Sequence, residues 1–237
     1  EKDHAELQTD GYVHPDFKGL GVGTSLLRKV GERALAEIPL AEPDLRVFIR
    51  STMDNKDVEG HALHQAEGYS SIRYHWRMEI KLPEAPSAVT WPEGIELRPF
   101  VKDEHAIAVW QANNEAFRDH WGSHDASYEE FVHSRFDDPE FDPSLWVIAW
   151  DGDEIAGFSL NRFRMGIGWV RSLGVRRPWR KKGLGLAMLQ HSFGEFYRRD
   201  KSTIGLGVDA SNPTGATRLY QRAGMYIASE FVTYEKE

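Results

Sequence analysis

The chain has 237 residues, a length that fits one large domain or two modest ones. Its 41% hydrophobic and 12% aromatic residues exclude wholesale disorder, and the absence of cysteine excludes disulfide scaffolds, cysteine zinc sites and cysteine nucleophiles. The net charge of −8 argues against a protein whose whole surface binds polyanions. Because no apolar run approaches the roughly 18–20 residues of a membrane span and no secretory segment opens the sequence, we expect a cytoplasmic protein without membrane contact.

The first elements of the chain recur later in it. Residues 13–27 run from a strand end through a polar loop and a Gly-x-Gly pair into an apolar helix, and residues 175–189 repeat this order without a gap. Residues 62–69 match residues 218–225 in the same way, and each of these blocks ends a helix at a glycine. Two ordered matches at nearly the same offset indicate a duplicated domain.

A segment with three prolines, residues 83–94, separates the two copies and is predicted to be a linker. We therefore predict a partial, degenerate N-terminal domain over residues 1–82 and a complete C-terminal domain over residues 95–237. The first copy has no counterpart of residues 95–168, and a sheet without its opening strands would leave an edge uncovered. We expect the N-terminal half of the first copy to be absent from this sequence.

The second copy alternates strand and helix patterns. Period-two alternation and turn signals predict strands, and 3.6-residue spacing predicts helices. In chain order these are a strand at 95–100, helices at 104–117 and 128–136, strands at 145–150, 154–160 and 169–175, a helix at 183–199, a strand at 204–208, a helix at 213–223 and a strand at 225–234. This order predicts the α/β class, with α and β elements around one mixed sheet.

The motif with the clearest chemistry follows the strand that ends at Val175. Residues 180–185 read Arg-Lys-Lys-Gly-Leu-Gly and open a helix. Six basic residues crowd this part of the chain: Arg171, Arg176, Arg177, Arg180, Lys181 and Lys182. Glycines let a backbone approach a ligand closely, and the free N–H groups of a helix start attract phosphate. The motif predicts a specific anion site, and the alternative is a solvated basic loop before a glycine-opened helix.

Together with Asn212 and residues 219–225, this motif resembles the GNAT superfamily of N-acetyltransferases. The resemblance covers residues 95–237 and implies a tandem GNAT acyltransferase fold, with an arrangement similar to that of the mycothiol synthase group within the superfamily. It implies acetyl-CoA as the co-substrate, no metal, and a small-molecule amine as the second partner. The amine would attack the CoA thioester directly in a ternary complex, and the C-terminal domain would be the catalytic one.

The resemblance also implies roles for individual residues. Residues 173–175 would pair with the pantetheine arm, and the Leu173 N–H would stabilise the thioester oxyanion as a catalytic group. Tyr220 would protonate the departing thiolate, or would simply be a packed helix aromatic. Asn212 would contact the pantetheine arm, cap the next helix, or do both. The implied cofactor-binding residues are Leu173, Gly174, Val175, Arg180, Lys181, Lys182, Gly183, Leu184, Gly185, Leu186 and Asn212.

The general base has no assignment. Many family members place a glutamate on the strand that enters the glycine-rich turn, and residues 166–172 contain none. Glu115, Asp119 and His120 are candidates, with surface or capping roles as the alternative. The acceptor pocket is expected beside the segment that follows Phe117.

The first copy departs from the pattern of the family. Lys18 stands where the second copy has Arg180, and His64 stands where it has Tyr220, so we expect the first copy to bind CoA without turnover or to act as a structural partner. Two other classes of function compete with the enzyme. The missing glutamate favours a non-catalytic acyl-CoA-binding or sensing protein. A nucleic-acid-binding protein would use the basic cluster, but the acidic net charge argues against a nucleic-acid partner. The oligomeric state does not follow from the sequence.

Overall fold

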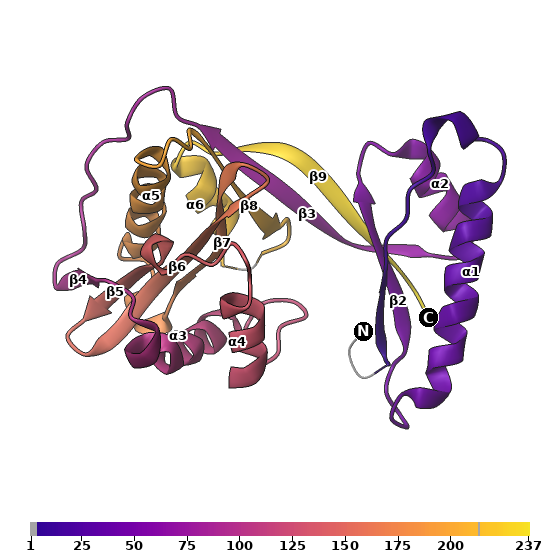
Figure 1. Ribbon diagram of the computed structural model, residues 1–237, viewed down its shortest axis with the longest axis horizontal. Coiled ribbons are helices and arrows are strands. Elements are labelled where there is room, and N and C mark those ends of the chain that lie inside the picture. Colours follow the sequence, from indigo (N-terminus) through magenta and orange to yellow (C-terminus); the bar gives the residue numbers. More distant parts are fainter. Residues whose placement is uncertain (1–3, 213) are drawn as a thin grey trace. The chain divides into compact units, whose positions relative to one another are not determined.

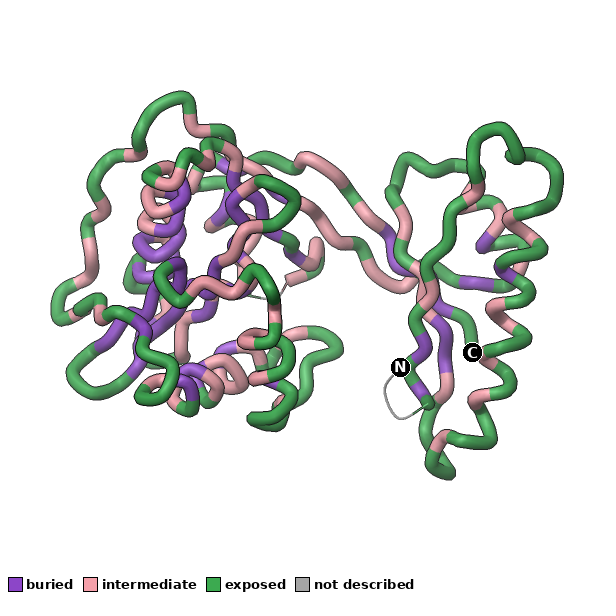
Figure 2. Tube along the Cα trace, viewed as in Figure 1, coloured by how far each residue is buried: buried purple, intermediate pink, exposed green. Residues whose placement is uncertain are grey.

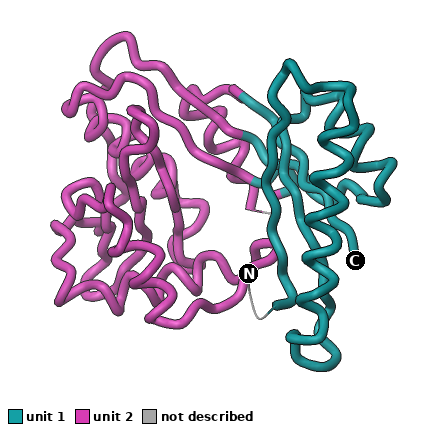
Figure 3. Tube along the Cα trace, turned by 45° about the vertical axis from the view of Figure 1, so that its right-hand side comes forward, with its two compact units in different colours: residues 1–76, 209–211, 229–237 teal, residues 77–208, 212–228 magenta. Residues whose placement is uncertain are grey.

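The computed structural model describes residues 4–212 and 214–237, and the chain divides into two compact units. One unit, unit 1, is formed by the chain up to Trp76 together with Asp209–Ser211 and Ser229–Glu237. The other, unit 2, is formed by Arg77–Val208 and Asn212–Ala228 (Figure 3). Each unit therefore combines segments that lie far apart in the sequence.

The predicted mixed α/β fold is confirmed (Figure 1). Backbone hydrogen bonds link the strands of the described residues in the order β1-β2-β9-β3-β8-β7-β6-β5-β4. The strands are β1 (Glu6–Thr9), β2 (Phe48–Asp54), β3 (Ser70–Lys81), β4 (Ile95–Arg98), β5 (Val147–Asp151), β6 (Glu154–Arg164), β7 (Ile167–Val175), β8 (Thr203–Asp209) and β9 (Tyr226–Lys236).

The helices agree with the predicted pattern. They are α1 (Val22–Glu37), α2 (Val58–Ala66), α3 (Lys102–Phe117), α4 (Tyr128–Phe136), α5 (Leu184–Tyr197) and α6 (Ala216–Arg222). Helix α4 begins where predicted because Ser127 and Glu130 form a capping box, in which each side chain accepts the other residue's backbone N–H. None of the helices in the described residues is long and apolar enough to cross a membrane.

Unit 2 packs helices on both faces of its strands. Strands β4, β5, β6 and β7 pair antiparallel in sequence order, and β7 pairs parallel to β8. On one face, α3 and α4 cover a core that includes Phe131, Trp146 and Phe158. On the other face, Leu184 and Met188 of α5 pack against the alternate side chains of β5 and β6. Figure 2 shows the buried residues along these strands and α5.

Unit 1 repeats part of this plan. Strand β1 runs parallel to β2, as β7 does to β8, and α1 follows β1 as α5 follows β7. Leu27 of α1 packs with Leu7 and Ile49 in the core of the unit. The order β1, α1, β2 therefore matches the order β7, α5, β8.

The two copies exchange their last strands. Strand β9 belongs to the second copy by sequence, but it pairs antiparallel with β2 of the first copy from Asp54↔Phe231 to Ile49↔Lys236. Strand β3 belongs to the first copy, but it lies next to β8 in the strand order. The end of β3 is part of unit 2, where Met78 is fully buried and Ile80 Cδ1 lies 3.3 Å from the position of a Cβ on Gly224. The predicted bounds of the two domains describe the copies along the sequence and stay a prediction.

We expect a fragment of residues 77–237 to be more stable than one of residues 83–237. The longer fragment keeps the part of β3 that belongs to unit 2, and burial of Met78 alone stabilises the fold by about 2 kcal/mol. Urea unfolding of both fragments measures the difference. Equal midpoints would show that unit 2 does not depend on this strand.

Candidate functional site

Strand β7 has an unpaired edge at the predicted thioester position. It pairs with β6 along its length, from Arg164↔Ile167 to Gly157↔Val175. It pairs with β8 only at Gly168–Val170, although β8 continues to Asp209 (Figure 1). In the part of the chain that the structure describes, the β8-facing edge of residues 171–175 therefore has no strand partner. This edge is open to an extended ligand, as the prediction for Leu173, Gly174 and Val175 requires, apart from the Val175 carbonyl, which accepts a hydrogen bond from Arg180.

A β-bulge lies at the start of this unpaired edge. Leu160 of β6 stands opposite Ser172 and Asn161 stands opposite Val170, so Arg171 is the extra residue. A bulge re-aims side chains and backbone groups locally. The strand beyond it is tightly packed, because a Cβ on Gly174 would lie 2.3 Å from Phe158 Cζ.

The Gly-rich loop has the conformation of an anion cradle. Lys181 and Gly183 take positive φ angles of 64° and 86°, and α5 begins directly after Gly183. The first backbone bond of the helix runs from the Ala187 N–H to the Gly183 carbonyl. The N–H groups at the helix start therefore have no intrahelical acceptor and carry the positive end of the helix dipole. This is the predicted cofactor-binding segment, from Arg180 to Leu186.

The Arg180 side chain is hydrogen-bonded to backbone carbonyls of β7 and α3 and does not extend into solvent. Its Nε donates to the Val175 carbonyl at 3.0 Å, and its Nη2 donates to the Ala116 carbonyl near the end of α3 at 3.2 Å. Lys181 and Lys182 are exposed, with no acidic partner among residues 4–212 and 214–237. These two lysines supply the positive charge of the loop.

Most of the basic cluster is paired with carboxylates. Arg176 donates to Glu115 at 2.6 Å, and Arg177 donates to Asp119 at 2.8 Å. The hydrogen bond from Arg177 is the main cause that lowers the pKa of the Asp119 carboxyl. These ion pairs tie the end of α3 to the loop. The lowered pKa makes Asp119 a poor general base, and the Glu115 carboxylate is already occupied by Arg176.

Tyr220 lies on α6 with its side chain only 8% exposed. Burial raises its pKa to about 12. Its hydroxyl therefore keeps its proton at neutral pH, and none of the described residues hydrogen-bonds it. Helix α6 is held against the loop, because Leu219 Cδ1 lies 3.0 Å from the position of a Cβ on Gly185.

Comparisons with known proteins agree with this geometry. The profile of the acetyltransferase (GNAT) family matches residues 106–225, more than half of the chain. The chain belongs to the GNAT acetyltransferase family. It is an acyltransferase, and the GNAT acetyltransferases use acetyl-CoA.

Individual relatives of this GNAT chain are similar over most of its length. A mycothiol acetyltransferase from Streptomyces scabiei is 31% identical to this chain, and the match covers 95% of this chain and 68% of the relative's length. The crystal structure of a GCN5-related N-acetyltransferase from Sphaerobacter thermophilus has a TM-score of 0.86 and 37% identity, and the match covers 100% of this chain and 74% of that one. A tandem GNAT protein from the clavulanic acid biosynthesis pathway shares the fold, with a TM-score of 0.73 and 17% identity. That match covers 98% of this chain and 75% of that one.

Asn212 forms a turn ahead of α6. Its Oδ1 accepts the Thr214 backbone N–H at 2.8 Å and the Thr214 hydroxyl at 2.5 Å. The residue that caps the helix is Gly215, so Asn212 is not the N-cap. Pro213, at the predicted helix start, lies outside the described residues. Contact of Asn212 with the pantetheine arm stays a prediction.

The first copy has the same loop conformation with fewer basic residues. Gly19 and Gly21 have φ angles of 74° and 77°, at the positions of Lys181 and Gly183. Lys18, the counterpart of Arg180, pairs with Glu59 at 2.9 Å. Its loop therefore offers the same backbone turn without the two exposed lysines of the second copy.

Sequence reasoning missed one group of residues in the second copy. Arg135, Asp138 and Arg162 gather with Arg171 around a hollow beside the β7 bulge. Only Arg171 carried a signal, as the single ionisable side chain on its strand. Asn161 lines the same hollow.

Proposed function

We propose that this chain transfers the acetyl group of acetyl-CoA to a small-molecule amine by direct attack in a ternary complex. The unpaired edge of β7 beside the glycine-rich loop carries the proposal, because it offers one continuous backbone surface to a pantetheine arm and its diphosphate. Both features belong to the second copy, which is therefore the catalytic one.

The reaction needs four roles. The N–H groups from Lys181 to Leu186 hold the diphosphate, and the edge of β7 aligns the thioester. The amine nitrogen attacks the carbonyl carbon, and the Leu173 N–H stabilises the oxyanion that forms. The C–S bond then breaks, and Tyr220 donates a proton to the departing thiolate. The attacking nitrogen releases its proton to water, because Glu115 and Asp119 are held in ion pairs, and water returns a proton to Tyr220.

No enzyme-bound acetyl group is formed on cysteine, since the sequence contains none. Direct attack makes CoA release depend on the amine in every turnover. It also predicts that acetyl-CoA alone leaves the mass of the protein unchanged.

The assay measures CoA thiol release from acetyl-CoA with a panel of small amines, and mass spectrometry identifies the acetylated product. The acceptor of the mycothiol acetyltransferases belongs in the panel, because the curated relatives carry that name. Amine-dependent thiol release with an equal amount of acetylated amine is expected. Tight acetyl-CoA binding with no product from any amine would instead favour a sensing protein, and an acetylated protein would contradict direct attack.

A further inference from the structure

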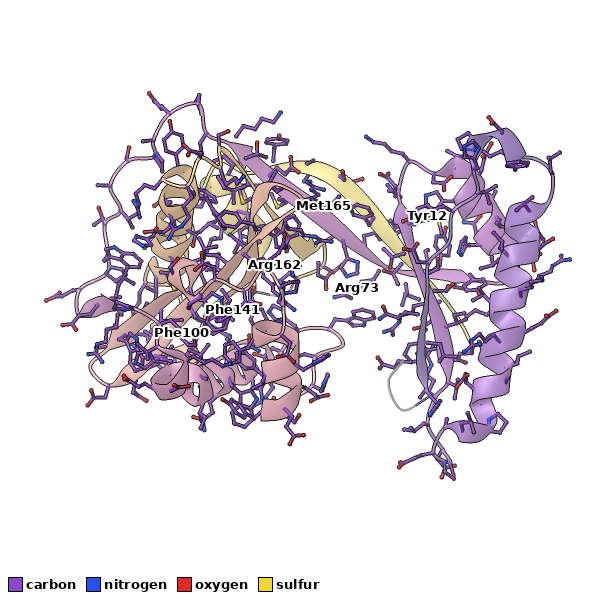
Figure 4. The ribbon with its side chains drawn as sticks, in the orientation of Figure 1. Tyr12, Arg73, Phe100, Phe141, Arg162 and Met165 are labelled. Carbon is purple, nitrogen blue, oxygen red and sulfur yellow. The ribbon has the colours of Figure 1, made fainter. Side chains whose placement is uncertain are left out.

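Three arginine side chains from separate elements meet at one hollow in unit 2. Arg135 comes from α4, Arg162 from β6 and Arg171 from the β7 bulge, and they line a small hollow that is partly open to solvent. Asp138 lies among them, and its Oδ2 accepts hydrogen bonds from Arg171 Nη1 at 3.0 Å and from Arg162 Nη1. Figure 4 labels Arg162 and Phe141, two of the residues around the hollow.

The charges around the hollow do not balance. Three guanidinium groups face a single carboxylate, so two positive charges are left without a negative partner among the lining residues. Burial, with smaller effects from Arg171 and Arg162, lowers the pKa of Arg135 to about 10, and the group remains charged at neutral pH. Packing like charges together in a half-buried place is unfavourable unless an anion compensates them.

Two of the arginines that line the hollow also have buried hydrogen-bond donors without acceptors. The Nε atoms of Arg135 and Arg162 are buried, and neither has a hydrogen-bond partner in the described part of the chain. Buried donors in folded proteins nearly always have a partner. Arginine matches the oxygens of a carboxylate or phosphoryl group with paired donors, and such charge-assisted bonds are short and strong.

The hollow opens beside the reacting strand. Arg135 Nη2 lies 3.3 Å from Ser172 Oγ, and Ser172 directly precedes Leu173. Arg171 is two residues from Leu173, or about 7 Å along the strand. Trp146 and Leu160, which also line the hollow, belong to the core under α3 and α4, whereas Leu173 packs on the α5 side. An anion held here would anchor the far end of an acceptor whose amine reaches the thioester.

We propose that the hollow formed by Arg135, Arg162, Arg171 and Asp138 binds an anionic group, a carboxylate or a phosphoryl group, of the acceptor amine. The inference rests on the proposed function for the identity of the ligand as acceptor. The hollow itself is tested without turnover. Asp138 holds two of the arginines in place, and the anion takes the donors that Asp138 leaves unmet.

The first experiment titrates inorganic phosphate and acetate into the Gly183→Glu variant by calorimetry. This background blocks the helix start at the loop, so remaining anion binding reports on the hollow. Adding Arg171→Gln is expected to weaken the binding of at least one anion tenfold or more. The control is Arg198→Gln, which removes the same charge from an exposed residue at the end of α5.

Anion binding to the two variants tells the possible outcomes apart. Anion binding that falls with Arg171→Gln and survives Arg198→Gln supports the hollow. Binding that is absent at about 50 mM anion, or that is equal in both variants, overturns it. The anion that binds more tightly distinguishes a phosphoryl from a carboxylate ligand. Amine-dependent thiol release from acetyl-CoA by the wild-type protein tests the proposed function separately, because the loop and the hollow share no residue.

The second experiment compares matched acceptors. We expect an amine with a carboxylate or phosphate group to have at least a tenfold lower KM than its neutral amide or alcohol analogue. Arg171→Gln is expected to remove that preference with a smaller change in kcat. Equal KM values for charged and neutral amines in the wild-type enzyme would contradict the inference.

Discussion

Tyr220→Phe is expected to lower kcat about a hundredfold, while the KM for acetyl-CoA stays within about twofold. The substitution removes only the hydroxyl and keeps the ring that is buried on α6. Burial raises the pKa of Tyr220 to about 12, so the group is protonated throughout the ordinary assay range and is present as a donor in every turnover. A thiolate that leaves without this donor carries its full charge, which raises the barrier for breaking the C–S bond.

The pH profile separates this role from others. Because the pKa of Tyr220 lies well above the range of about pH 6 to 9, the wild-type and Phe enzymes are expected to have profiles of the same shape at different heights. Tyr226→Phe is the matched control, since it makes the same chemical change at an exposed tyrosine of the same unit. A Tyr220→Phe enzyme with at least half of the wild-type kcat would show that the residue is only a packed aromatic.

Gly183→Glu is expected to weaken acetyl-CoA binding at least a hundredfold. Gly183 has a φ of 86°, where a residue with a Cβ costs about 1–2 kcal/mol. The new carboxylate would also stand at the N–H groups that receive the diphosphate, and two like charges about 4 Å apart repel by about 4 kcal/mol near a protein surface. Calorimetry with acetyl-CoA measures the loss.

The first copy provides the control for this substitution. Gly21 has the same helix-capping position and a φ of 77°, so Gly21→Glu introduces the same charge with similar backbone strain. It is expected to leave acetyl-CoA binding within about twofold of the wild type. Equal losses in the two variants would mean that the effect comes from lost stability, and a Gly183→Glu protein that binds normally would contradict the role of the loop.

Local elements were predictable because local interactions define them. The bounds of α4 follow from its capping box, and the turn between β5 and β6 follows from Asp151-Gly152-Asp153, where Gly152 has a φ of 60°. The glycine-rich loop stood out because its glycines and basic residues are consecutive in the sequence, and Gly183 takes a positive φ of 86° there. In each case the signal and the structure lie within a few residues of one another.

The partners of the strands were not predictable in the same way. The sequence matches β3 with β9 as equivalent strands of the two copies, and nothing in either strand states which copy it will join. The exchange appears only when all neighbours are known, because β9 pairs with β2 and β3 lies beside β8. Choices among long-range partners depend on the packing of the whole sheet.

The partners of the charged residues could not be predicted from the sequence either. Six basic residues near the loop indicated one concentrated anion site, but carboxylates on α3 pair with Arg176 and Arg177. Arg171, at the bulge, lines a hollow with Arg135 and Arg162. The sequence therefore showed that this region is rich in basic residues, but it could not show which of them are paired with carboxylates.

The central claim is that acetyl-CoA occupies one site, on the β7 edge and the loop of the second copy. The measurement that tests it most directly is the stoichiometry of acetyl-CoA binding to the wild-type chain by calorimetry. We predict one acetyl-CoA per chain, because the first copy keeps the turn but lacks the exposed lysines and pairs Lys18 with Glu59. Two equivalent sites per chain, or no binding to the folded protein at millimolar acetyl-CoA, would contradict the account.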